Sequence, residues 1–185
     1  MTAELHTRFL LHPSPIGEVL VVTTDEPDAT PGPDVKTGIV TLHPLRSVLG
    51  SELERLSRVL RGTVDHDEDD ALANDAARQL DEYFVGERRE FDLALDWRLV
   101  RGFTRAALEA VREIPYGETA GYGEVAVTAG SPGAARAVGT ACATTPFSIV
   151  VPVHRVVRAD GSIGEYGGHP EDKAFLLGLE QAAGV

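Results

Sequence analysis

Two side chains in the C-terminal half of the chain, His154 and Cys142, have the chemistry to take part in a reaction. An imidazole exchanges protons readily near neutral pH, and a cysteine becomes a nucleophile when a neighbouring base or positive charge favours its thiolate. A histidine within an apolar run such as 151–157 is as often a hydrogen-bonded core residue, and a free cysteine is commonly a small apolar side chain. Because Cys142 is the only cysteine, neither an intrachain disulfide nor a cysteine-based metal site is expected.

The segment 133–143 is built almost entirely of small side chains, and Arg136 is its one long charged residue. Ser131 and Pro132 precede it, which predicts an N-cap and a first helical turn. A helix of this composition can pack closely against another helix. It can also enter a DNA groove, with Arg136 holding the gap that an extruded base leaves. The residues alone leave both interpretations open.

The elements around these residues are predicted from apolar spacing and turn signals. In the C-terminal half we expect helices at 103–114, 121–129, 133–143 and 171–182, and a buried strand at 149–153. Two short helices joined by a tight glycine-containing turn form a helix-turn-helix.

The N-terminal half is predicted to be a small sheet with helices. The expected strands are 7–12, 19–23, 38–42 and 91–95, and the expected helices are 48–59 and 71–84. A turn at Ser14–Gly17 should join the first two strands, and the acidic run Asp65–Asp70 should be a solvated loop. The fold class is therefore α+β, with a sheet-and-helix domain at 1–95 and a mostly helical domain with a helix-turn-helix at 96–185.

The charge of the chain argues against tight non-specific binding to DNA. The net charge is −12, of which residues 1–100 carry −10 and residues 101–185 carry −2. An acidic protein lacks the positive field that steers proteins to nucleic acid, although the near-neutral C-terminal half could present a local basic face. No apolar run is long enough to span a bilayer and no signal peptide is evident, so we expect a cytoplasmic monomer.

The run Pro152–Val157 resembles the active-site signature of O6-alkylguanine-DNA alkyltransferases, in which a proline and an acceptor cysteine precede His-Arg and two aliphatic residues. Further stretches match that family in order and spacing, over about residues 78–180. They are Ile114–Thr119, Tyr122–Ala126, Ala135–Gly139, Asp160–Ser162, Tyr166–Gly168, Lys173–Leu177 and Glu180. The similarity therefore rests on several motifs.

The resemblance implies roles for particular residues. In that family a thiolate attacks the alkyl carbon on guanine O6, a histidine takes the thiol proton through a water, and a glutamate orients the histidine. By position, His154 would be the base and Glu180 the orienting carboxylate. The implied DNA-binding residues are Tyr122, Ala135, Arg136 and Gly139, and the implied base-pocket residues are Val153, Tyr166, Gly167 and Gly168. No metal or organic cofactor is implied.

The departures from the family pattern bear on activity. Valine at the acceptor position, Val153, has no lone pair, so nucleophilic catalysis there is impossible. Cys142 falls where the family usually has an asparagine that ties the recognition helix to the active-site strand, and Thr145-Pro146 replaces an Asn-Pro pair. Residual transfer through Cys142 stays open, but a sulfur misplaced by about 1 Å can cost on the order of a hundredfold in rate.

The sequence therefore predicts a protein of DNA-damage recognition and repair, similar to the alkyltransferase-like proteins. It would flip O6-alkylguanine out of double-stranded DNA without transferring the alkyl group, and a downstream repair protein would respond. Those proteins typically lack an N-terminal domain, so the chain looks more like a full-length alkyltransferase that has lost its sulfur. The alternative is a repurposed enzyme that uses His154 and Glu180 on a small molecule, which suits the acidic charge better.

Overall fold

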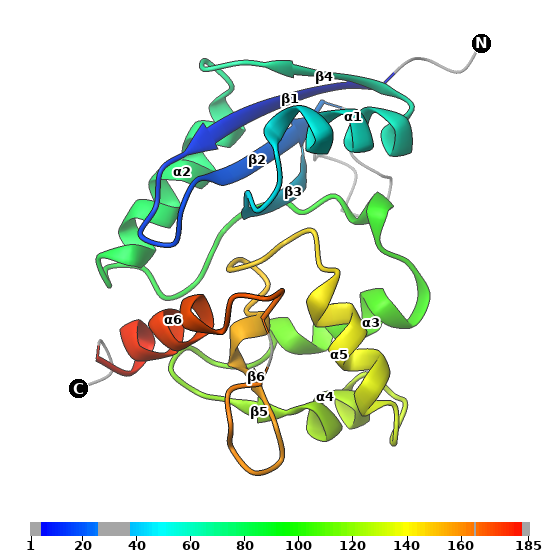
Figure 1. Ribbon diagram of the computed structural model, residues 1–185, viewed down its shortest axis with the longest axis vertical. Coiled ribbons are helices and arrows are strands. Elements are labelled where there is room, and N and C mark those ends of the chain that lie inside the picture. Colours follow the sequence, from blue (N-terminus) through cyan, green and yellow to red (C-terminus); the bar gives the residue numbers. More distant parts are fainter. Residues whose placement is uncertain (1–4, 26–37, 165, 183–185) are drawn as a thin grey trace. The chain divides into compact units, whose positions relative to one another are not determined.

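The computed structural model describes residues 5–25, 38–164 and 166–182, in two compact units that span Met1–Leu99 and Val100–Val185 (Figure 1). The first unit contains a four-stranded sheet with helices, and the second is mostly helical. The predicted α+β class is therefore confirmed. Within the described ranges, no helix has both the length and the apolar character needed to cross a membrane.

The sheet of the first unit has the strand order β3-β2-β1-β4. Its strands are β1 (Leu5–His12), β2 (Val19–Thr24), β3 (Gly38–Pro44) and β4 (Gly62–His66). The predicted hairpin of β1 and β2 is confirmed, and Leu11 pairs with Leu20. Gly17 closes its turn: the Gly17 N–H donates to Ser14 O at 3.1 Å, and its φ of 99° lies in the left-handed region that favours glycine.

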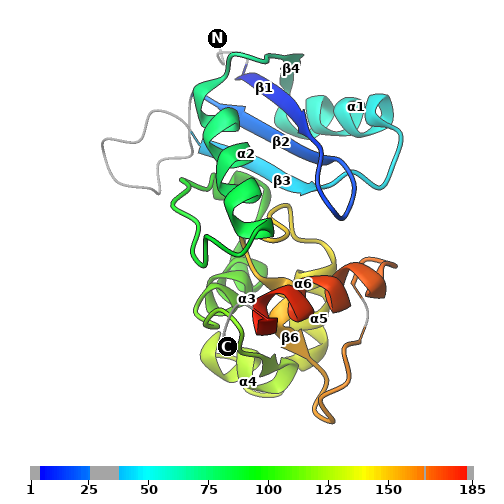
Figure 2. The same cartoon turned by 90° about the vertical axis from the view of Figure 1, so that its left-hand side faces the viewer.

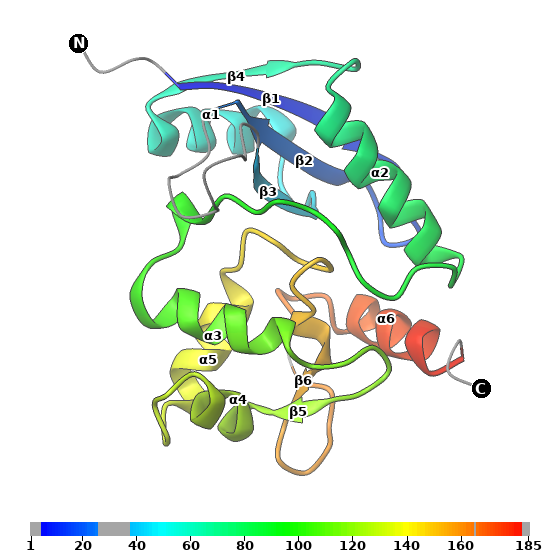
Figure 3. The same cartoon turned by 180° about the vertical axis from the view of Figure 1, so that it is seen from behind.

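Two helices cover opposite faces of this sheet. Helix α1 (Leu49–Leu60) lies in front of the strands in Figure 1, and α2 (Ala71–Phe84) lies in front of them in Figure 3. Every residue of β2 is buried, because one face packs against Leu56 of α1 and the other against α2. The Asp70 carboxylate caps α2 by accepting a hydrogen bond from Ala73 N at 2.7 Å.

Two predictions for the first unit were wrong. Residues 91–95 do not form a strand: Leu95 makes only an isolated bridge to Ile39 and leads into a short 3₁₀ turn, η1 (Trp97–Leu99). The acidic run is not all loop, because Asp65 belongs to β4, which pairs in parallel with β1. Local alternation could not reveal either result, since both depend on which distant strand offers a hydrogen-bonding edge.

The second unit holds the predicted helix-turn-helix (Figure 2). Its helices are α3 (Gly102–Arg112), α4 (Tyr122–Thr128), α5 (Ala135–Ala143) and α6 (Pro170–Ala182). Helix α4 ends in a Schellman motif: Ser131 N donates to Ala126 O at 2.9 Å, and Gly130 N donates to Val127 O at 2.9 Å. Gly130 has a φ of 77°, so a glycine is needed where the chain turns from α4 toward α5.

Two predictions for the second unit were also wrong. Ser131 does not cap α5, which begins at Ala135 with Ala134 as its N-cap and no side-chain cap. Residues 149–153 are buried but form no continuous strand, and Ile149 has a φ of 76°. Burial in a closely packed unit, rather than strand pairing, accounts for the apolar run there.

The acceptor position and Tyr122 are brought together by a short parallel pairing. Val153 begins a 3₁₀ turn, η2 (Val153–Arg155), which leads into β6 (Val156–Val157). Strand β6 pairs with β5 (Ala120–Gly121), and β5 runs directly into α4, whose first residue is Tyr122.

Candidate functional site

The carboxylate of Glu180, on α6, is the centre of a buried hydrogen-bond network. His154 Nε2 and Glu180 Oε1 lie 2.7 Å apart, and both side chains are 0% exposed. The structure therefore brings together the histidine and the glutamate that the family resemblance pairs, although they lie on separate elements, η2 and α6.

Arg155 completes this network and was not singled out from the sequence. Its Nε donates to Glu180 Oε2 at 2.9 Å and its Nη2 to Glu180 Oε1 at 3.0 Å, a two-pronged contact that suits the planar guanidinium. Its Nη1 donates to Ile114 O at 2.7 Å, and Gly117 N donates to Glu180 Oε2 at 3.0 Å. One carboxylate thus ties α6 both to η2 and to the turn that follows α3.

These hydrogen bonds determine the charge state of the pair. Burial by itself raises the pKa of Glu180, but the hydrogen bonds from His154 and Arg155 outweigh burial and hold that pKa at about 2. Burial lowers the pKa of His154, and the hydrogen bond to Glu180 opposes this effect only in part. At neutral pH the pair is therefore a carboxylate beside a neutral imidazole, whose proton lies on Nε2 if the ring donates to Glu180.

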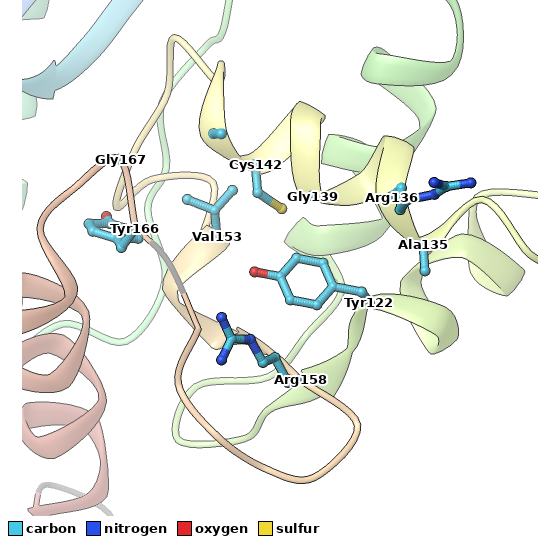
Figure 4. A pocket seen from close by; sticks show the side chains of 10 residues that line it. Tyr122, Ala135, Arg136, Gly139, Cys142, Val153, Arg158, Tyr166 and Gly167 are labelled. Carbon is cyan, nitrogen blue, oxygen red and sulfur yellow. The ribbon is translucent and has the colours of Figure 1, made fainter.

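A pocket of about 370 Å³ opens beside this network (Figure 4). Its wall comes from α4, α5, η2 and the glycine-rich segment before α6. The lining residues are Tyr122, Ala135, Arg136, Gly139, Cys142, Ala143, Val153, Arg158, Tyr166 and Gly167. The set includes almost every residue predicted from the sequence for DNA contact or the base pocket. Gly168 is the exception among them, and His154 and Glu180 do not line the pocket.

Val153 and Cys142 share the wall of this pocket. Val153 is 3% exposed and presents an apolar side chain. Burial raises the pKa of the Cys142 thiol to about 12, and the nearby Lys173 ammonium opposes that rise only in part. The one sulfur in the pocket is therefore a neutral thiol at neutral pH.

Cys142 lies inside α5, two residues before the C-cap of that helix, and not in the connection to η2. In that connection the Thr145 hydroxyl accepts a hydrogen bond from Phe147 N at 3.1 Å. The short polar side chain of Thr145 thus fixes the segment between α5 and Val153.

Lys173, which the sequence offered only as one matching residue among many, lies near two residues that line the pocket, Tyr122 and Cys142. Its side chain is 0% exposed, and its Nζ donates to Val156 O at 2.5 Å. Burial lowers the pKa of Lys173. Its ammonium lies 6.0 Å from the centre of the Tyr122 ring, within reach of a cation–π contact. The only sequence signal for this position was the run Lys173–Leu177 that matches the family.

Helix α5 presents different residues to the pocket and to solvent. Gly139 faces Tyr122: a Cβ at position 139 would lie 3.8 Å from the Tyr122 ring, an ordinary van der Waals contact. Arg136 is exposed on the same helix, and its side chain projects away from Val153 in Figure 4. Ala135 lies next to it at the rim.

Together these features define a class of protein: a sheet-bearing unit followed by a helix-turn-helix unit whose recognition helix forms one wall of a pocket. The model of the 6-O-methylguanine DNA methyltransferase DNA binding domain matches residues 102–182, and that of the family's ribonuclease-like domain matches residues 35–97. The chain belongs to the O6-methylguanine DNA methyltransferase family, a family of DNA-binding repair proteins.

Solved structures support this assignment along almost the whole chain. Mycobacterium tuberculosis OGT in complex with DNA superimposes with a TM-score of 0.72 at 36% identity, over 96% of this chain and 94% of that one. The O6-methylguanine-DNA methyltransferase of Pyrococcus kodakaraensis gives a TM-score of 0.63 at 26% identity, over 95% and 99%.

Curated sequences match over somewhat more than half of the chain. The methylated-DNA–protein-cysteine methyltransferase of Mycolicibacterium paratuberculosis is 51% identical over 106 residues, which are 57% of this chain and 64% of that protein. That of Methanosarcina acetivorans is 43% identical over 113 residues, or 61% and 72%. The match thus spans less than two thirds of the length of the first of these relatives.

Proposed function

We propose that this protein binds double-stranded DNA and holds a flipped O6-alkylguanine in the pocket without transferring the alkyl group. One observation carries the proposal: the acceptor position of the family signature is Val153, and its side chain forms part of the pocket wall. A hydrocarbon side chain can contact an alkyl group but cannot attack it.

Binding to DNA is supported by the family and by the form of the second unit. The relatives include a protein crystallised with DNA, and a DNA-binding domain model covers α3 to α6 here. Helix α5 presents Arg136 to solvent, where it could enter the duplex and hold the place of the flipped nucleotide. Tyr122 stands at the pocket, between α5 and β6, where it could turn the nucleotide.

Transfer to Cys142 is disfavoured. At pH 7 a thiol with a pKa of about 12 is ionised to about one part in 10⁵, and the thiolate is the reactive form. The described residues that line the pocket include no histidine or carboxylate that could deprotonate it. The neutral Cys142 thiol therefore supports a protein that binds the lesion rather than one in which Cys142 accepts the alkyl group.

A small-molecule enzyme that uses His154 and Glu180 is also disfavoured. Both side chains are 0% exposed, and neither lines the pocket. A general acid or base must come within hydrogen-bond reach of the proton it transfers. His154 and Glu180 instead hold together the elements that shape the pocket. A downstream repair protein would therefore have to bind the outer surface of the protein–DNA complex.

The test is equilibrium binding of the full chain to one duplex with guanine or O6-methylguanine at a single position, at two salt concentrations, followed by intact mass. We expect tighter binding to the lesion and no gain in mass. Arg136→Ala should weaken binding by about tenfold, and the matched charge change Arg112→Ala, on α3 away from the pocket, should not. A gain of one methyl group by the wild type would contradict the proposal, as would equal binding to both duplexes.

A further inference from the structure

Arg158 is a pocket residue to which neither the sequence motifs nor the proposed function gives a role. It follows β6 and is held in a tight loop: its N–H donates to Ser162 O at 3.0 Å, and its carbonyl accepts from Gly161 N at 2.9 Å. Its guanidinium extends toward the space that Val153, Tyr122 and Tyr166 surround (Figure 4).

The Arg158 side chain packs against Gly164, whose backbone conformation favours glycine. Gly164 has a φ of 70°, and a Cβ there would lie 3.5 Å from both Cγ and Nε of Arg158 and 3.7 Å from the Tyr122 hydroxyl. The Arg158 side chain therefore lies across Gly164, next to the Tyr122 hydroxyl. The loop places the Arg158 cation at the edge of the pocket, where the residue is still exposed to solvent.

The charged side chains among the described residues that line the pocket are opposite in sign to the net charge of the chain. They are Arg136 and Arg158, and none of these described lining residues is a carboxylate. None of the carboxylates in the described ranges forms an ion pair with Arg158. Asp160, two residues away, has a lowered pKa chiefly because of the hydrogen bond from Ser162, and the charge of Arg158 contributes less. Lys173 adds a third cation near the pocket. Burial is the largest cause of the lowered pKa of Lys173, and the charge of Arg158 lowers it further.

We propose that Arg158 makes this pocket selective for guanine adducts whose O6 substituent ends in a carboxylate, in preference to neutral alkyl groups; this rests on the proposed function. With the flipped base in the pocket, the O6 substituent would lie against the Val153 wall, in the space toward which Arg158 extends. A carboxylate there would accept charge-assisted hydrogen bonds from the guanidinium, whereas a methyl group would leave the cation without an anionic partner.

Backbone phosphate offers the same chemistry, an anionic oxygen, from a different source. A contact between Arg158 and a phosphate would strengthen binding to every duplex equally, because phosphates carry no information about the lesion. A contact with the adduct would strengthen binding only when the adduct is anionic. This difference separates the two sources.

The experiment measures binding of the full chain to one duplex carrying guanine, O6-methylguanine or O6-carboxymethylguanine, with the wild type, Arg158→Met and the matched control Arg112→Met. We expect the wild type to bind the carboxymethyl duplex about fivefold tighter than the methyl duplex, as for a partly exposed charge-assisted contact. Arg158→Met should remove that difference and keep the preference for methylguanine over guanine. Arg112→Met should behave as the wild type, and unchanged melting temperatures should confirm that both variants fold.

Each other result overturns the inference. If Arg158→Met weakens binding to all three duplexes by one factor and lowers the salt dependence, Arg158 contacts phosphate. Equal wild-type binding to the two adducts overturns selectivity while leaving the proposed function intact. If the wild type does not separate either adduct from guanine, the proposed function fails as well.

Discussion

His154 Nε2 lies 2.7 Å from Glu180 Oε1 in the interior of the second unit, beside an acceptor position that holds no sulfur. The hydrogen bond that would orient a catalytic base in the family is thus present in a chain that has Val153 at the signature's cysteine position. Retaining it is consistent with a structural role, because the same carboxylate joins Arg155, Gly117 and α6.

Restoring the sulfur should restore the chemistry. Val153→Cys places a thiol at the pocket wall, next in sequence to His154, and should gain the mass of one methyl group on incubation with a duplex containing O6-methylguanine. Intact-mass spectrometry is the measurement, and Val153→Ala, which opens a similar space without sulfur, is the control. No mass gain in Val153→Cys, despite binding, would show that more than the nucleophile has been lost.

Glu180 should contribute more to stability than an exposed carboxylate. Glu180→Gln leaves the buried Arg155 charge without its anion, and we expect the free energy of unfolding to fall by about 3–5 kcal/mol. Glu171→Gln on the same helix changes an exposed carboxylate that lies 3.0 Å from His169 Nδ1, and it should cost roughly 0–1 kcal/mol. Urea denaturation of the two variants makes the comparison. Equal losses would mean that the network contributes little.

Acid should destabilise the protein through both members of the pair. Because the folded pKa of Glu180 is lowered from 4.5 to about 2, its contribution of roughly 3 kcal/mol is present above pH 4.5 and is lost as the pH falls toward 2. The folded pKa of His154 is also lowered, so the unfolded state gains a proton first and stability begins to fall below pH 6.5. NMR titration of the Glu180 carboxyl carbon and the His154 ring tests this; a Glu180 midpoint near 4.5 would refute it.

Cys142 should be unreactive in the folded protein. With a pKa of about 12, its thiol should react with a soluble disulfide reagent at pH 7 at least about a hundredfold more slowly than in the urea-unfolded chain. Cys142→Ala should bind the O6-methylguanine duplex within about twofold of the wild type, since only a small apolar contact changes. Rapid native labelling would instead indicate an activated thiol and reopen the shifted-acceptor hypothesis.

The sequence by itself predicted the features whose signals are local. The β1–β2 hairpin follows from alternation around Ser14–Gly17, and helix α2 begins and ends at the predicted residues because its apolar spacing and flanking residues agree. The family motifs also assigned functional roles to Val153, Tyr122 and Tyr166; all three line one pocket, and their roles stay predictions.

Only the tertiary structure decided the features that depend on distant partners. The pairing of β4 with β1, the irregular path of 149–153 and the start of α5 at Ala135 each reflect which edge or surface was available for packing. The structure also showed that Glu180 binds Arg155 as well as His154, and that Arg158 extends into the pocket across Gly164. A side chain's charge can be read from the sequence, but its pKa, its partner and the cavity it faces are determined by residues far away in the chain.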